Sequence, residues 1–172
     1  SVLFNQLVLK KEHNINMLTC IKSGHYVEKI KDKTKLFSLN KKRVIFSILS
    51  LVNFLRKNNS NIIFTSMTHT NITALIIKIF FLSRLKVIIR ESNTISVKAK
   101  ETLGIKNIFL NYMVKVLYNY ADHIVAPTKI IKNDLIANYG IRREKIRVIV
   151  NPYNFEEIYT KSKEAIKKGE KK

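Results

Sequence analysis

The sequence has one cysteine, four glycines and two prolines in 172 residues, and these scarcities exclude several kinds of site. Four dispersed glycines cannot form a glycine-rich phosphate loop, and no Gly-x-Ser-x-Gly sequence marks a serine hydrolase. A lone cysteine, Cys20, indicates a reduced, cytosolic setting, in which we expect a buried thiol. So few glycines and prolines are typical of helices and strands that are joined by short connections.

Patterns of metal ligands and of membrane-spanning helices are also missing. The sequence has no His-x-x-x-His spacing, no cysteine pair and no clustered acidic triad. The apolar stretches at 44–55 and 72–82 are shorter than the roughly 20 apolar residues that a spanning helix needs, and Lys78 interrupts the second. We therefore expect this chain to bind no metal and no cofactor of its own.

Acidic residues are scarce as well, 12 against 32 basic ones, which gives a net charge of +20. Such an excess points to a polyanionic partner, either an anionic membrane surface or a nucleic acid, unless surface positions have simply drifted to lysine. The lysines are scattered, and no zinc spacing or helix-turn-helix pattern accompanies them. We therefore expect no specific nucleic-acid partner, while membrane attraction and compositional drift both stay open.

What the sequence does contain is a repeated alternation of short apolar runs and longer amphipathic ones. Strands are predicted at 15–21, 35–39, 62–66, 86–90, 123–126 and 145–150, and helices at 1–11, 41–57, 72–81, 105–120 and 129–139. Asn40 and Asn71 are expected as N-caps. The alternation predicts an α/β fold, a Rossmann-like, doubly wound parallel sheet with helices on both faces.

The clearest local signals lie in residues 117–152, LYNYADHIVAPTKIIKNDLIANYGIRREKIRVIVNP. Asp122 is expected to brace the entry to a short apolar strand by hydrogen bonds. Thr128 then follows a proline and suits the N-cap of a helix, with Lys129 after it. Gly140 can take the left-handed conformation that ends this helix. Strand, helix and strand within about 35 residues form the βαβ unit of a parallel sheet.

The same stretch resembles the end of the N-terminal domain in GT-B retaining glycosyltransferases of family 4. The resemblance rests on the order Y-x-x-A-D-x-I-V-A-x-[ST], then L…Y-G-I-x-x-x-K-I-x-V-I-x-N-P, and it extends back through RESNTIS at 90–96. It implies the N-terminal half of a GT-B fold, and a bacterial enzyme that moves a sugar with retention from a nucleotide-sugar donor. The implied acceptor is a polysaccharide or a lipid-linked glycan.

The resemblance also implies a domain organisation. Residues 1–152 would form the acceptor-side domain without the family's first strand and glycine-rich loop, and 153–172 would be a lysine-rich linker or tail where the donor-binding domain begins. Because sugar transfer needs that missing domain as a partner, we expect the chain to be inactive alone. The alternative is a non-catalytic Rossmann-like domain that binds a membrane surface or a protein partner.

Polar side chains follow two of the predicted strands at their carboxyl ends, where parallel sheets bind ligands. Relatives often have R-E-H-N in the loop at 90–93, and Ser92 stands here where the histidine would be, so the catalytic residues stay unknown. Glu91, Ser92 and Asn93 are candidates to bind acceptor hydroxyls, or Ser92 or Asn93 instead caps the next helical turn. His69 is a further acceptor-binding candidate, with a merely exposed or structural histidine as the alternative.

The helix predicted at 105–120 is apolar over much of its circumference. Its lysines, Lys106 and Lys115, flank apolar side chains that could contact a bilayer, namely Phe109, Tyr112, Met113 and Tyr118. A basic amphipathic helix can lie in the membrane interface, and the resemblance implies work at the cytoplasmic face of a membrane. Packing of this helix in the core of the domain is the alternative.

Overall fold

The computed structural model describes residues 14–20, 35–41, 44–101 and 105–151, together with residues 159 and 162. The helix predicted for residues 1–11 lies outside the described residues, and so does almost all of the tail predicted from 153 onward.

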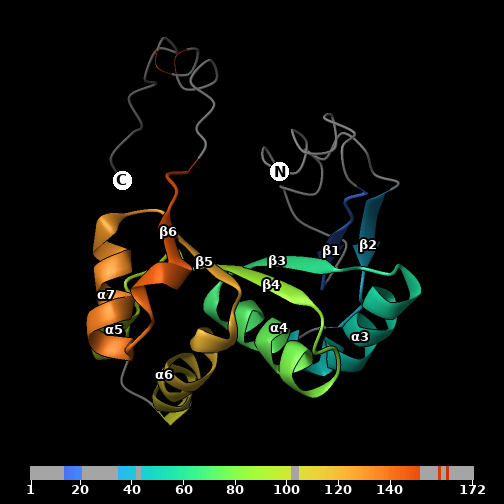
Figure 1. Ribbon diagram of the computed structural model, residues 1–172, viewed down its shortest axis with the longest axis horizontal. Helices are drawn as coiled ribbons and strands as arrows, with labels where there is room; N and C mark the ends of the chain where they lie inside the picture. The colour runs from blue at the N-terminus through green and yellow to red at the C-terminus, as the bar shows by residue number, and fades with distance from the viewer. Residues whose placement is uncertain are drawn as a thin grey trace, which may run out of the picture.

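Six described strands form two parallel sheets (Figure 1). The first sheet pairs two strands, and the second has four strands in the order β3-β4-β5-β6. The strands are β1 (Met17–Thr19), β2 (Leu36–Ser38), β3 (Ile62–Ser66), β4 (Lys86–Arg90), β5 (His123–Ala126) and β6 (Ile146–Val148).

Helices connect the strands from β2 to β6 in the way that the alternating pattern predicts. The α-helices are α3 (Ile48–Lys57), α4 (Thr68–Phe80), α5 (Ile95–Glu101), α6 (Ile105–Leu117) and α7 (Lys129–Tyr139). Single-turn 3-10 helices occur at Val44–Ser47, Tyr118–Tyr120 and Arg143–Lys145. Each connection in the order β3 to β6 moves to the next strand on the same side, so right-handed crossovers bring α4, α6 and α7 to one face of the sheet.

The core lies between that face and the helices. Alternate residues of the strands, among them Val87, Ile89, Ile124 and Ile146, are fully buried there with Leu75, Val114 and Leu135 from the helices. The opposite face carries Ile62 and Phe64, which are exposed and in register with the side chains of β4. Burial of one face is what fixes the register, because a slip of one residue would exchange the two faces.

The small sheet is attached to the rest of the domain through apolar side chains. Leu36 of β2 is buried, and Leu18 of β1 packs against the main core. The rings of Phe37 and Phe54 lie 5.0 Å apart at 60°, which joins β2 to α3 in a tilted aromatic pair.

The predicted fold class, a Rossmann-like α/β domain with a parallel sheet flanked by helices, is confirmed. The strands predicted at 62–66, 86–90 and 123–126 have those bounds, and β1, β2 and β6 are shorter than predicted. Cys20, expected to be buried, is half-buried, because it follows the last residue of β1 rather than lying inside the strand.

Two of the predicted N-caps are wrong. Helix α4 begins at Thr68, four residues before the predicted start, so Asn71 lies inside the helix and Met67 is at the N-cap position. Asn40 lies in the loop after β2 with a φ of 50°, and the N-cap of α3 is Ser47. Asparagine at these positions therefore serves other purposes than the local pattern suggested.

The signals around α7 are confirmed. The Thr128 side chain accepts a hydrogen bond from the backbone N–H of Ile131 at 3.2 Å, as an N-cap should. Gly140 ends the helix in the left-handed conformation, with φ 64° and ψ 29°. A β-carbon at Gly140 would meet nothing within 4 Å, so conformation alone accounts for the glycine.

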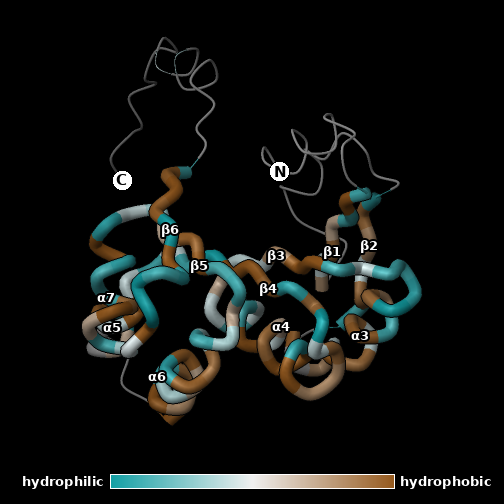
Figure 2. The backbone as a smooth tube through the Cα atoms, viewed as in Figure 1, coloured by the Kyte–Doolittle hydropathy of each residue, from teal (hydrophilic) through white to brown (hydrophobic). Residues whose placement is uncertain are grey.

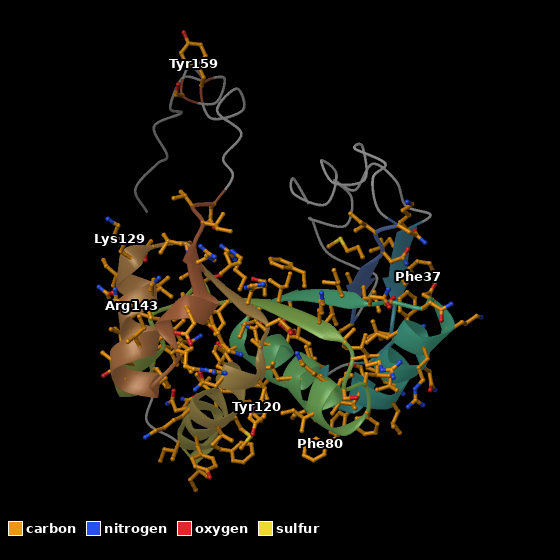
Figure 3. The ribbon with its side chains drawn as sticks, in the orientation of Figure 1. Phe37, Phe80, Tyr120, Lys129, Arg143 and Tyr159 are labelled. Atoms are coloured by element: carbon orange, nitrogen blue, oxygen red, sulfur yellow. The ribbon has the colours of Figure 1, made fainter. Side chains whose placement is uncertain are left out.

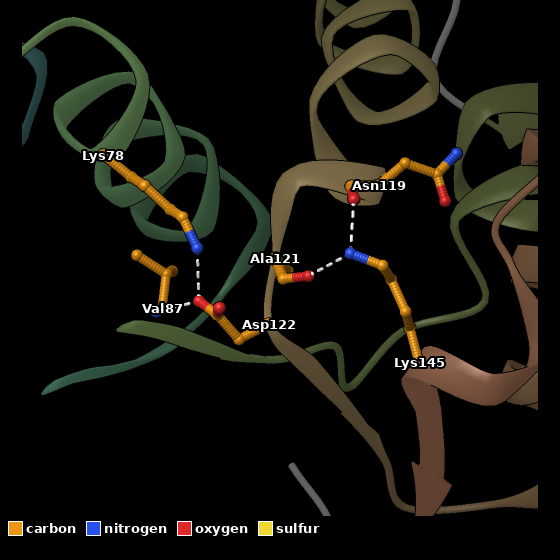
Figure 4. A network of polar contacts seen from close by, with 6 residues as sticks. All are labelled: Lys78, Val87, Asn119, Ala121, Asp122 and Lys145. Atoms are coloured by element: carbon orange, nitrogen blue, oxygen red, sulfur yellow. Dashed lines mark hydrogen bonds and ion pairs between the residues drawn. The ribbon is translucent and has the colours of Figure 1, made fainter. Parts of the chain in front are cut away.

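Asp122 braces the entry to β5 by hydrogen bonds, as the sequence predicts, and it also ties α4 to the sheet (Figure 4). Its Oδ2 accepts hydrogen bonds from Lys78 Nζ and from the backbone N–H of Val87, the latter at 2.7 Å. Burial on its own raises the pKa of this carboxyl, but the hydrogen bonds from Lys78 and Val87 and the charges of Lys78 and Lys145 lower that pKa below its ordinary value.

Lys145 extends the same network towards β6. Its Nζ donates to the backbone carbonyls of Asn119 at 2.6 Å and Ala121 at 2.7 Å, in and just after the 3-10 helix that precedes β5 (Figure 4). Burial, followed by the nearby charge of Arg142, lowers the pKa of Lys145. The turn that leads into β5 is thus held from both sides by side chains distant in the sequence.

Replacing Asp122 by asparagine tests this network. We expect Asp122→Asn to lower the free energy of unfolding by about 1–2 kcal/mol near pH 7, because Lys78 loses its charged partner. Since the pKa of the folded carboxyl lies below that of the unfolded one, its stabilisation is complete above about pH 4 and is lost as pH falls through the folded pKa. Urea unfolding between about pH 7 and pH 3 measures both effects, and the gap between the two proteins should close in acid.

Glu144→Gln is the matched control. Glu144 faces Arg142 at 3.9 Å with both side chains exposed, so its removal should change the free energy of unfolding by no more than about 0.5 kcal/mol. A gap between Asp122→Asn and the parent protein that stays constant across this pH range would contradict the role given to Asp122.

Candidate functional site

Glu91 is the centre of the carboxyl edge of the sheet, directly after β4. Its side chain is fully buried, yet no basic side chain of the described residues forms an ion pair with it. Four donors surround the carboxylate instead. They are the hydroxyl of Tyr118 at 2.7 Å, the hydroxyl of Thr68 at 3.1 Å, and the backbone N–H groups of Ser92 at 3.1 Å and Asn93 at 3.3 Å. A buried carboxylate is tolerated only when its oxygens are satisfied in this way.

Tyr118 and Asn71 carry the network further into the core. The Asn71 amide donates to the Tyr118 hydroxyl at 3.2 Å and to the Arg90 carbonyl at 3.0 Å, while its oxygen accepts from Thr65 at 2.8 Å. Burial first, and then the charge of Glu91, raise the pKa of Tyr118 well above its ordinary value. Tyr118 therefore stays a neutral donor to Glu91, and the amide predicted as a helix cap instead joins α4 to β4.

Arg90, the last residue of β4, is half-buried and points to neutral partners. Its Nη1 donates to the hydroxyl of Ser66 at 3.1 Å and to that of Ser92 at 2.5 Å, and its Nη2 donates to the side-chain oxygen of Asn151. The guanidinium of Arg90 thus contacts the ends of β3 and β4 and the segment after β6. No carboxylate among the described residues neutralises its charge.

Met67 forms the turn between β3 and α4 at this edge. It has φ 91° and ψ 136°, a conformation that side chains other than glycine rarely adopt, and it is 55% exposed. Such strain costs of order 1–3 kcal/mol and persists where the surrounding structure imposes it, often at binding sites. Here the strain lets Thr68 begin a helix at once, which brings its hydroxyl to Glu91.

The four candidate residues from the sequence lie at this one edge. Glu91 and Ser92 are within the network, and Asn93 is exposed, with only its backbone N–H bound to Glu91. His69 is exposed in the first turn of α4, next to Thr68. In the part of the chain that the structure describes, neither the Asn93 amide nor the His69 ring has a hydrogen-bond partner, so both can face a ligand.

Sequence reasoning missed Ser66, Thr68 and Tyr118 as members of the site, and took Asn151 as the end of a strand and the passage to a second domain. Their contacts join residues up to 61 positions apart, and a local pattern cannot predict those. The one available signal was the position of two of them, because Ser66 is the last residue of a strand and Thr68 closely follows it.

A hollow of ≈ 410 Å³ lies at the opposite end of β3 and β4 and contains none of these residues. It is lined by the loops that precede the two strands, among them Asn61 and Leu85. Ligands of parallel sheets bind at the carboxyl ends of strands, and the unneutralised guanidinium lies there as well. We therefore place the candidate site at the edge with Arg90 and Glu91.

Metal sites and membrane-spanning helices are both absent from the described residues. Among the described residues, no three His, Cys, Asp or Glu side chains gather closely enough to hold a metal ion. In the same part of the chain no helix has the length and hydrophobicity to cross a bilayer.

Comparison with protein families gives a match to the model described as Glycosyltransferase Family 4, over residues 9–157. Nothing among curated proteins matches the chain. The matched range contains β1 to β6 and the whole of the candidate site up to Asn151.

A double-mutant cycle tests the contact between Glu91 and Tyr118. Glu91→Gln should lower the free energy of unfolding by about 2–3 kcal/mol, because its new N–H donors face the donors that the carboxylate satisfied. Tyr118→Phe should cost about 1–2 kcal/mol. The double variant should lose at least about 1 kcal/mol less than the sum, measured by urea unfolding. Strict additivity would mean that the contact does not organise the edge.

Replacing Met67 by glycine should relieve the strained turn. We expect Met67→Gly to raise the free energy of unfolding by about 1 kcal/mol, since glycine adopts a positive φ without steric cost and loses only part of that gain in unfolded-state entropy. Met67→Ala removes the same exposed side chain but keeps a β-carbon, so it should bring no gain. Equal effects of the two substitutions in thermal or urea unfolding would argue against strain at this position.

Proposed function

This chain belongs to glycosyltransferase family 4, and from that premise we propose that it is the acceptor-side domain of a bacterial retaining glycosyltransferase. The full enzyme would transfer a sugar from a nucleotide-sugar donor to a polysaccharide or a lipid-linked glycan. Membership in the family gives the domain a role in glycosyl transfer, and the acceptor side, the retention of configuration and the bacterial origin are parts of the proposal.

The observation that carries the proposal is the unneutralised Arg90 at the carboxyl edge of the sheet. Sugar hydroxyls and phosphate oxygens both accept hydrogen bonds from a guanidinium. Arg90 is held by Ser66, Ser92 and Asn151, and these neutral partners position it without cancelling its charge. A polar acceptor or a phosphate oxygen next to it would gain a charged donor in a fixed place.

The candidate acceptor-binding residues divide into two roles in this proposal. Asn93 and His69 are exposed and offer free side chains, so they would contact the hydroxyls of the acceptor. Glu91 and Ser92 would act by position, since Glu91 fixes the backbone of the loop that presents Asn93 and Ser92 orients Arg90. The catalytic residues are not assigned to this chain.

Transfer also needs a donor-binding domain, which we propose as the partner of residues 1–152. In this family the present region needs no cofactor, and the nucleotide sugar would be held mainly by the partner. Asn151 lies where chains of this family pass to the second domain, and it is hydrogen-bonded to Arg90. The segment that leads to the second domain is therefore in direct contact with the candidate site. A non-catalytic domain that only binds a partner or a membrane is the second hypothesis.

A transfer assay on the chain alone, and on the chain joined to a family-4 donor-binding domain, separates these hypotheses. We expect no transfer by the chain alone and transfer by the joined protein. Transfer by the chain alone would contradict the need for a partner, and failure of several joined proteins to turn over would favour the non-catalytic hypothesis.

Within an active joined protein, Arg90→Gln should lower kcat/KM by about tenfold to a hundredfold, the effect of losing one charged hydrogen bond. Arg142→Gln is the matched control, since the exposed Arg142 side chain faces Glu144 at 3.9 Å and no residue of the site, and it should leave kcat/KM within about twofold. If both substitutions lower kcat/KM equally, Arg90 does not belong to the site. Circular dichroism before the assay confirms that each variant is folded.

A further inference from the structure

Helix α6 is apolar on two sides, and only one of them is needed for the core. Its inner side chains pack against the main cluster, with Val114 and Leu117 buried and Leu110 and Met113 partly buried. Met113 and Tyr118, two of the candidates for contact with a bilayer, therefore lie in the interior, in line with the alternative of core packing. The outer side nevertheless carries large apolar residues that are between 41% and 86% exposed, which are Ile105, Ile108, Phe109, Tyr112, Val116 and Tyr120.

These six residues, which we call the outer stripe, recur at spacings of three and four along the helix and its last turn. Residues at such spacings share one side of a helix, so the outer stripe is continuous. Brown, hydrophobic segments run through α6 at the lower edge of the molecule in Figure 2. Figure 3 shows Tyr120 and the exposed Phe80 of α4 along the same edge. An extended apolar surface of this kind marks an interaction site in a protein that must stay in solution.

The charged residues along α6 are of one sign. From residue 102 to residue 121 the sequence contains no aspartate or glutamate, and the only charged residues of α6 are Lys106 and Lys115. Lys115 is exposed and precedes Val116, so it lies beside the stripe. A partner that complements this surface therefore has an apolar interior and negative charges at its boundary.

A second copy of the chain does not meet that description, because both copies would bring a net charge of +20 and the same lysines. An anionic bilayer does meet it, since acyl chains can accept the stripe and headgroups can accept the lysines. Tyr112 and Tyr120 suit the interface, where aromatic rings with a polar group are favoured, and the wholly apolar ring of Phe109 suits the acyl region. With 13 residues, α6 is shorter than the roughly 20 that would span the bilayer.

We propose that α6 docks the domain on an anionic lipid bilayer, with the outer stripe in the headgroup and upper acyl region and α6 parallel to the surface. The proposal goes beyond glycosyl transfer, because it concerns binding by this chain and holds whether or not the domain takes part in catalysis. It bears on the proposed acceptor only because a lipid-linked glycan would lie at the same membrane surface.

Vesicle sedimentation with the full chain tests the proposal. One vesicle contains phosphatidylcholine alone, and the other also contains phosphatidylglycerol. We expect binding to the second, weakened by added salt because the lysines are screened. The double variant Phe109→Ser/Tyr112→Ser should bind at least about tenfold more weakly. Lys115→Glu should weaken binding to phosphatidylglycerol vesicles and leave the stripe intact.

Phe46→Ser is the matched control, since Phe46 is 68% exposed against 63% for Phe109 but lies in the 3-10 helix before α3. It should bind as the parent does. Circular dichroism checks folding, and Ile105→Ser/Ile108→Ser replaces the first pair if that variant does not fold. The proposal is overturned if the parent binds neither vesicle, if Phe46→Ser weakens binding as much as the stripe variants, or if sedimentation equilibrium shows a dimer that the stripe variants abolish.

Discussion

The buried carboxylate of Glu91 pairs with no cation among the described residues, and this creates a demand for hydrogen-bond donors from the segments around it. Glu91 meets that demand with four donors that come from the turn into α4, from the 3-10 helix after α6 and from its own loop. Loss of any one donor would leave a charge short of hydrogen bonds in a medium of low dielectric constant, where the penalty is greatest. The relative positions of these segments are therefore set together, and the carboxyl edge of the sheet is rigid at its centre.

Rigidity at the centre contrasts with open side chains at the margin. Asn93 and His69 extend from a backbone that Glu91 and Thr68 hold in place, and Arg90 keeps its charge because its partners are neutral. A site of this kind offers donors and acceptors whose positions are fixed before a ligand arrives, which reduces the entropy lost on binding. Under the proposed acceptor-side role, the ligand of these groups would be the hydroxyl-rich acceptor of a sugar, which fits membership in glycosyltransferase family 4.

The sequence predicts best where the cause of a structure is local. The strand at 123–126, the N-cap at Thr128 and the left-handed stop at Gly140 each follow from a few neighbouring residues, and all three are present. The predicted start of α4 was wrong because Met67 adopts a strained, positive φ. No local pattern of residues indicates that conformation. Asn71 looked like a cap for its residue type, whereas its true partners, Arg90 and Tyr118, lie 19 and 47 positions away.

The same limit applies to the candidate site. The position of polar residues after strands was enough to gather Glu91, Ser92, Asn93 and His69 at one edge, since the carboxyl ends of parallel strands always meet there. Whether a side chain points inward or outward at that edge was not predictable, because it depends on contacts with Tyr118 of the 3-10 helix after α6 and with Thr68 of α4. Glu91 is consequently buried while its neighbour Asn93 is exposed.

Three of the twelve acidic residues do structural work inside the fold. Glu91 gathers the loop donors, Asp122 joins Lys78 to Val87, and Asp134 accepts from Ser96 and Asn138. Within the described residues, the acidic side chains that hold the fold together are these three, so exposed positions in that part of the chain are free to change from acidic to basic over evolutionary time without loss of the architecture. Relatives of very different isoelectric point could then share this domain, and surface charge would evolve with the partner while the interior stayed the same.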